Sequence, residues 1–183
     1  MDDFNTVQST ARRATVSARK KVANAFMLCE MTERSSSEYN DSYPTCLETY
    51  SALRIFSDHI QPDEIGGLLN IQPTSSFIKG EPHSKGNRLF RKANGWFYTT
   101  KKLSTSRDTR RHLDLLLELL KGKLGAVKQL QAKGCKMDIM AYYVSTGQGG
   151  PCLMPQQMLQ LGKLGIGIGW DVYFRKESET EDE

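Results

Sequence analysis

The stretch from Leu153 to Phe174 constrains the fold most, because a helical repeat changes there into a strand repeat. Pro155 suits the first turn of a helix, and apolar residues then recur at helical spacing as far as Leu164. From Ile166 onward the apolar residues alternate, so one face of a strand is apolar and the other carries two glycines, an aspartate and a tyrosine. This pattern predicts a helix that leads directly into a core strand.

The composition fits one globular domain with extensions, since 38% of the 183 residues are hydrophobic. No apolar run approaches the roughly 20 residues of a membrane-spanning helix. The N-terminal sequence MDDFNTVQ lacks the basic and apolar segments of a secretory signal, so we expect a cytoplasmic protein with no membrane partner. The four cysteines form no C-x-x-C pair, and we expect neither a metal site nor a cofactor.

Positive charge is concentrated in the middle of the chain. Between Lys79 and Lys136 lie fifteen Lys or Arg residues and four acidic ones, a local balance of +11, whereas the rest balances at −7. Such asymmetry favours an acidic protein or a nucleic acid as partner, although basic residues also solvate ordinary helix faces. The candidate binding residues are Lys79, Lys85, Arg88, Arg91, Lys92, Lys101, Lys102, Arg107, Arg110 and Arg111.

The chain divides into three segments. Residues 1–45 are a basic helical extension and a polar linker that has too little apolar surface to order itself. Residues 46–175 form the domain, and residues 176–183 are an acidic tail that we expect to be disordered. Within the domain, periodicity and capping residues predict strands at 46–56, 95–100, 135–144 and from 166, and helices at 62–69, 108–120, 124–133 and 155–164.

No known catalytic signature is present in the sequence. The alternating glycines near the C-terminus follow a helix and enter a strand, the reverse of a dinucleotide fingerprint. His83, in a polar loop, is the histidine best suited to a functional role, and Asp171 and Tyr173 could complete a pocket with it. A solvated loop histidine is the simpler interpretation, so we assign no catalytic residue and expect a non-enzymatic protein.

Aromatic and basic residues are interleaved around Trp96, where Phe90, Phe97 and Tyr98 fall among Lys and Arg. A surface that stacks nucleic-acid bases uses this combination. An ordinary strand with a basic rim has the same appearance, and Trp96, which follows a glycine among apolar neighbours, suits the core better. Nucleic-acid binding is therefore the alternative to protein binding.

Several short motifs together resemble a known family. They are Pro62-Asp63-Glu64-Ile65 with Leu68-Leu69, Ile71-x-Pro73, Gly80, Gly95-Trp96, the leucine helix, Leu164-Gly165 and Asp171-x-Tyr173. In this order they resemble, from about Leu47 to Phe174, the bacterial and phage family catalogued as domain of unknown function 4279. The resemblance implies a compact α+β domain and an immunity-type or other binding role, and it supplies no catalytic residues.

Together these features predict a two-layer α+β sandwich. A mixed β-sheet would carry its helices on one face, with the N-terminal helical extension outside it. The expected function is that of a binding protein, inhibitory or immunity-type, whose basic region engages an acidic protein partner. The alternative is a nucleic-acid-binding accessory protein that uses the same region and the Arg12–Lys21 helix.

Overall fold

The computed structural model describes residues 39–84 and 88–175, which build a five-stranded sheet in the order β2-β3-β1-β4-β5. Neighbouring strands are antiparallel except β4 and β5, which are parallel, so the sheet is mixed as predicted. The strands are β1 (Cys46–Ser57), β2 (Ser75–Phe77), β3 (Asn94–Thr99), β4 (Lys136–Ser145) and β5 (Gly167–Phe174).

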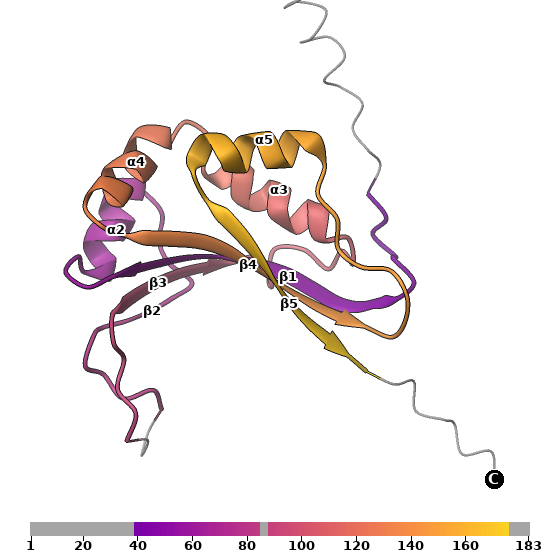
Figure 1. Ribbon diagram of the computed structural model, residues 1–183, viewed down its shortest axis with the longest axis horizontal. Coiled ribbons are helices and arrows are strands. Elements are labelled where there is room, and N and C mark those ends of the chain that lie inside the picture. Colours follow the sequence, from indigo (N-terminus) through magenta and orange to yellow (C-terminus); the bar gives the residue numbers. More distant parts are fainter. Residues whose placement is uncertain (1–38, 85–87, 176–183) are drawn as a thin grey trace, which may run out of the picture. The chain divides into compact units, whose positions relative to one another are not determined.

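The described helices all cover one face of this sheet, as Figure 1 shows. They are α2 (Pro62–Leu69), α3 (Thr109–Leu119), α4 (Leu124–Ala132) and α5 (Pro155–Leu164). The predicted α+β arrangement is therefore confirmed. The expected N-terminal helical extension lies outside the described residues. No helix among the described residues combines the length and apolar character needed to cross a membrane.

The helices begin and end at the residues that the sequence indicates. The side chain of Asp108 caps α3 by accepting a hydrogen bond of 3.0 Å from the backbone N–H of Arg110. Asn70 ends α2 in the left-handed conformation, with φ of 50°, and Gly165 ends α5 with φ of 66°. Because Gly165 needs no side-chain clearance there, the chain turns at once from α5 into β5.

The core lies between the sheet and the helices. Alternation along β1 directs Leu53 and Ile55 toward the helices, and both are fully buried. Trp96 is also fully buried, which agrees with its expected place in the core. The other large side chains that are fully buried are Tyr143, Ile65, Leu69, Leu113, Leu116, Leu120, Leu130, Ile139 and His112.

The C-terminal strand belongs to the core only at its beginning, which corrects our expectation of a fully apolar buried face. Ile166 is buried, and Ile168 and Trp170 are half-buried. Val172 is already 39% exposed and Phe174 is 76% exposed. The reason is that β5 is an edge strand whose end extends beyond the part of the sheet that the helices cover (Figure 1).

The start of the domain also differs from the sequence-based expectation, because residues 39–45 are ordered against α3. The Tyr39 hydroxyl donates to Asp114 at 2.6 Å, and the Asn40 N–H donates to Asp108 at 2.8 Å. Hydrogen bonds between residues far apart in sequence thus order a segment that has little apolar surface. Strand β2 was not predicted, since it has only three residues and pairs only with β3.

Candidate functional site

The loop between β3 and α3 carries three of the predicted cations, Lys101, Lys102 and Arg107, and the buried His112 holds it in place. The His112 Nε2 lies 2.9 Å from the Ser106 carbonyl oxygen, and its Nδ1 lies 2.8 Å from the Thr100 hydroxyl. Burial lowers the pKa of His112, so the ring is neutral near pH 7. Because a carbonyl oxygen can only accept, Nε2 carries the proton and Nδ1 accepts from Thr100.

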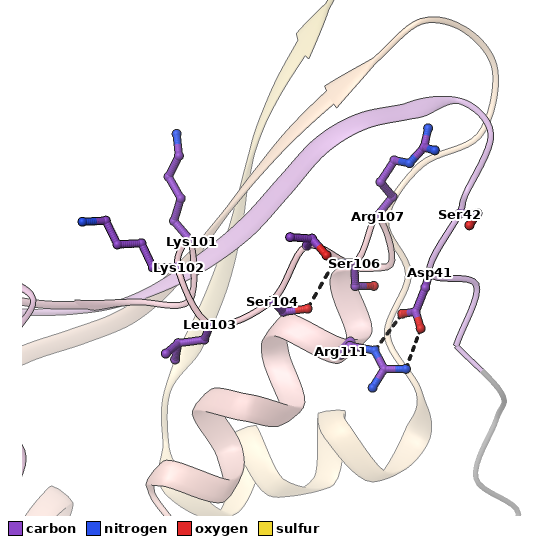
Figure 2. Close-up of a pocket in the computed structure, with 10 residues that line it drawn as sticks. Asp41, Ser42, Lys101, Lys102, Leu103, Ser104, Ser106, Arg107 and Arg111 are labelled. Atoms are coloured by element: carbon purple, nitrogen blue, oxygen red, sulfur yellow. Dashed lines mark hydrogen bonds and ion pairs between the residues drawn. The ribbon is translucent and has the colours of Figure 1, made fainter.

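A hollow of about 940 Å³ opens beside this loop, and Figure 2 shows the side chains around it. Asp41 closes one end, where its carboxylate accepts hydrogen bonds of 2.7 Å from both Nε and Nη2 of Arg111. The carbonyl oxygen of Asp41 also accepts the N–H of Arg107 at 3.0 Å. The lining residues are Asp41, Ser42, Lys101, Lys102, Leu103, Ser104, Thr105, Ser106, Arg107 and Arg111.

The hollow carries an excess of positive charge, because, among the residues that the structure describes, four cations and a single carboxylate, that of Asp41, line it. We call these cations, Lys101, Lys102, Arg107 and Arg111, the basic surface. The hydrogen bonds from Arg111 lower the pKa of Asp41, so this carboxyl stays charged and offsets one cation. Lys102 has no hydrogen-bond or ion-pair partner among residues 39–84 and 88–175.

The remaining cations are only partly compensated. Lys101 Nζ lies 3.0 Å from Glu48 Oε1, and this contact raises the pKa of Lys101. Both side chains are about half exposed, so water screens the pair strongly. One Arg107 Nη1–H donates to the Cys46 carbonyl at 3.3 Å.

The cations spread outward from the loop instead of converging on one point. Figure 2 shows Lys101 and Lys102 at one end of the hollow and Arg107 and Arg111 near the other, with the serines of the loop between them. A single small anion would require donors that meet at one place. The observed arrangement suits a longer ligand with several negative charges.

The other predicted basic residues do not join this surface. The guanidinium of Arg110 forms a nearly buried ion pair with Asp108, and Lys79 lies 3.4 Å from Asp58. Arg91 lies over the ring of Phe77, and it also donates to the His83 carbonyl at 3.2 Å. Arg88 and Lys92 lie in the segment between β2 and β3, and Lys85 falls outside the described residues.

The structure does not assemble the pocket that we considered for His83, Asp171 and Tyr173. Asp171 and Tyr173 are neighbours on β5, where the Tyr173 hydroxyl donates to Asp171 at 3.0 Å. His83 belongs to the segment that follows β2, at the opposite edge of the sheet. Three strands separate the two edges, so His83 cannot reach the pair. Among the described residues, no group of three His, Cys, Asp or Glu side chains could hold a metal ion.

Our sequence-based prediction missed a second feature, a group of aromatic side chains on one face of the sheet. The face of the sheet opposite the described helices carries six aromatic rings from the five described strands, which we call the aromatic face: Tyr50, Phe56, Phe77, Phe97, Tyr142 and Tyr173. The ring centres of Tyr50 and Tyr142 are 4.8 Å apart, and those of Tyr142 and Tyr173 are 5.2 Å apart. Phe97 lies 5.4 Å from Phe56 and 5.3 Å from Phe77. Two aromatic clusters therefore lie on the side of the sheet opposite the described helices.

Paired charges lie among these rings. Arg54 bonds Asp138 in a bidentate manner, with Nε to Oδ1 at 2.6 Å and Nη2 to Oδ2 at 2.9 Å. Lys101 of the basic surface lies 4.9 Å from the ring centre of Tyr50, so the two features meet at this residue. Part of the aromatic face was visible in the sequence, because Tyr50 and Phe56 belong to the set of alternating β1 residues that points away from the core. The other rings come from four other strands, which the sequence pattern does not connect with β1.

The comparisons with known proteins identify a family and no individual relative. The family model described as domain of unknown function DUF4279 matches residues 47–175. No curated protein and no solved structure matches the chain. The matched range begins with the second residue of β1 and ends just after β5, so it covers the whole sheet and its helices. The chain belongs to the DUF4279 family of domains of unknown function.

Proposed function

We propose that this chain is a non-enzymatic binding protein that engages an acidic protein partner through the basic surface. The observation that carries the proposal is the excess of cations around the hollow, spread along its length. An extended acidic segment could pair with several of them at once. Such charge complementarity accelerates association and selects the partner more than it adds affinity. An inhibitory or immunity-type protein, which covers a target, would use its surface in this way.

The neighbouring aromatic face supports a protein as the partner. Tyr, Phe and Arg are enriched in the centres of protein interfaces, and this face combines them with Arg54 and Lys101. It also carries the carboxylates of Glu48, Asp138 and Asp171. These would repel a uniformly charged phosphate backbone lying across the rings, whereas a protein can place apolar or basic residues there and its acidic segment along the basic surface.

Nucleic-acid binding is the second candidate, and one contact favours it. Lys101 lies over the Tyr50 ring, which places a cation for a phosphate beside a ring on which a base could stack. The two candidates differ in the ligand that survives nuclease treatment, so one experiment separates them.

The test is capture of binding partners from native lysate, with and without nuclease, by three forms of the full chain. These are the wild type, Lys101→Glu/Lys102→Glu, and Lys121→Glu/Lys123→Glu. The last variant makes the same change of charge near the α3–α4 turn, away from the hollow. We expect one nuclease-resistant protein that the first variant loses and the control keeps.

Two results would contradict the proposal. Equal loss of the partner in both variants would mean that net charge, and not this surface, is responsible. Capture of nucleic acid, with all bound protein lost on digestion, would establish the second candidate instead. Direct binding of a labelled glutamate-rich peptide and of a labelled DNA strand by the purified forms would then measure the preference.

A further inference from the structure

The outer edge of β5 is an unpaired strand edge. β5 pairs with β4 along one side, and no described residue forms a strand along its other side. Its last residues are well exposed, with Tyr173 at 48% and Phe174 at 76%. An edge of this kind presents free N–H and C=O groups that another strand can pair with.

The two edges of the sheet differ in how they are protected. β2 has three residues, and a short edge strand offers few free backbone groups. β5 has eight residues, contains neither Lys nor Pro, and carries one formal charge, that of Asp171. Natural sheets usually protect a long edge with a lysine, a proline, a bulge or a covering segment. β5 has neither a lysine nor a proline, and no described residue pairs with its outer edge.

The small and large side chains of β5 are distributed so that the strand could pair with an antiparallel copy of itself. On the side opposite the described helices, the first half of β5 has Gly167 and Gly169, and the second half has Asp171 and Tyr173. A Cβ added to Gly167 would meet nothing within 4 Å, so packing within the chain does not explain why a glycine stands there. A bulky side chain from a neighbouring strand would explain it.

We infer that two copies of this chain pair through β5 in an antiparallel, two-fold arrangement centred on Trp170. Tyr173 of each copy then lies opposite Gly167 of the other, and Asp171 opposite Gly169. Aromatic rings placed across from glycines shield the bare backbone and stabilise sheets. On the helix side Val172 meets Ile168, so apolar residues cover each other. The two five-stranded sheets become one continuous sheet.

Other registers fit less well. A register centred on Asp171 would place the two carboxylates directly opposite each other, which is destabilising. A register centred on Val172 would pair only residues 170–174 of β5 and leave Gly167 without a partner in the strand. The register centred on Trp170 pairs residues 167–173 and places Tyr173 opposite Gly167, where an added Cβ would have no neighbour within 4 Å in its own chain.

Charge supports a second copy as the occupant of this edge. In this register Phe174 of one copy lies opposite Ile166 of the other, next to the C-terminal end of α5. Lys163 belongs to the last turn of α5, and Lys128 donates to the Leu164 carbonyl at 3.4 Å. The sequence after Arg175 is KESETEDE, with five acidic residues and one lysine, so its charge is opposite to that of this region.

The molar mass of the full chain, measured by light scattering during size exclusion, tests the pairing. We expect twice the 20.6 kDa of one chain for the wild type. Gly167→Leu, which would collide with Tyr173 of the other copy, and Val172→Lys, which protects the edge, should both halve the mass. Gly67→Leu is the matched control, because that glycine also has nothing within 4 Å but lies in α2. Circular dichroism should show all three variants folded.

A cross-link tests the register independently. Gly167→Cys with Tyr173→Cys, made with Cys29→Ser and Cys152→Ser, should give a disulfide-linked dimer on oxidation. Within one chain the two new cysteines are about 20 Å apart along an extended strand, too far for a disulfide. A wild-type chain that stays monomeric, or a dimer that persists in both edge variants, would overturn the inference.

Discussion

His112 shows how one buried side chain can hold the loop of the candidate site. It is fully buried and bonds the loop at both ends, through Thr100 and Ser106. Burial lowers its pKa below the ordinary value of 6.5. The unfolded chain therefore binds a proton near pH 6.5 that the folded chain does not yet bind. The free energy of unfolding should be fully maintained above pH 6.5 and should fall as the pH drops through that value.

The measurement is urea denaturation of wild type and His112→Ala between pH 8 and pH 5. The substitution should cost about 2–4 kcal/mol at pH 8, because it leaves a cavity and unpaired groups on Thr100 and Ser106. The variant should also lose most of the decline in stability between pH 7 and pH 5. An equal decline in both proteins would assign the pH dependence to other groups.

The ion pair between Asp108 and Arg110 is a second feature on which the stability of the fold depends. The two side chains are 7% and 13% exposed, and Asp108 also caps α3 and accepts the N–H of Asn40. Asp108→Ala should lower the free energy of unfolding by about 3–5 kcal/mol, because it leaves a poorly hydrated guanidinium without its carboxylate. Asp108→Ala with Arg110→Met should recover part of that loss. If the double variant is no more stable than the single one, the cap and not the ion pair carries the effect.

At the scale of elements, the contact of Gly95 with Phe77 ties β2 to β3. The Phe77 ring lies over Gly95, where an added Cβ would collide with it, and Arg91 lies 4.1 Å from the centre of that ring. Gly95→Ala should cost about 1–3 kcal/mol by displacing Phe77 from the aromatic face. Gly67→Ala is the control, since its Cβ has free space and alanine favours a helix. Equal free energies of unfolding for the two variants would show that the Phe77 ring can move aside without destabilising the fold.

The elements that could be predicted are those whose signals are local. Helix α5 and the turn into β5 follow from Pro155, the helical repeat and Gly165, and the structure confirms each of them. β2 could not be predicted in this way, because its three residues are strand only through pairing with β3. Residues 39–45 are ordered by hydrogen bonds to α3, which lies more than sixty positions away in the sequence.

The candidate site could also be predicted only where its residues are close together in the sequence. Lys101, Lys102, Arg107 and Arg111 are close in sequence, so a basic region was evident before the fold was known. The other side of the hollow comes from Asp41, which no local pattern connects with them. The aromatic face draws its rings from five strands, and only the strand order and register bring them together.

At the scale of the whole molecule, the four cations of the basic surface account for the net charge of +4, because the remaining basic and acidic residues balance. Binding of a glutamate-rich peptide should therefore weaken steeply as salt rises, since screening shortens the reach of each charge to about 3 Å at 1 M. Asp41→Asn removes the carboxylate of the hollow and releases the Arg111 guanidinium from its ion pair.

This variant should bind the peptide about two- to fivefold more tightly at low salt, and the gain should vanish at high salt. Asp58→Asn is the matched control, because it makes the same change of charge beside Lys79, outside the hollow. Fluorescence anisotropy of the labelled peptide, titrated at several salt concentrations, gives both the affinity of each variant and its dependence on salt. A gain of equal size in the two variants would mean that the peptide responds to the net charge of the chain. A gain confined to Asp41→Asn would locate its binding at the hollow, because Asp41→Asn releases Arg111 there whereas Asp58→Asn releases Lys79 outside it.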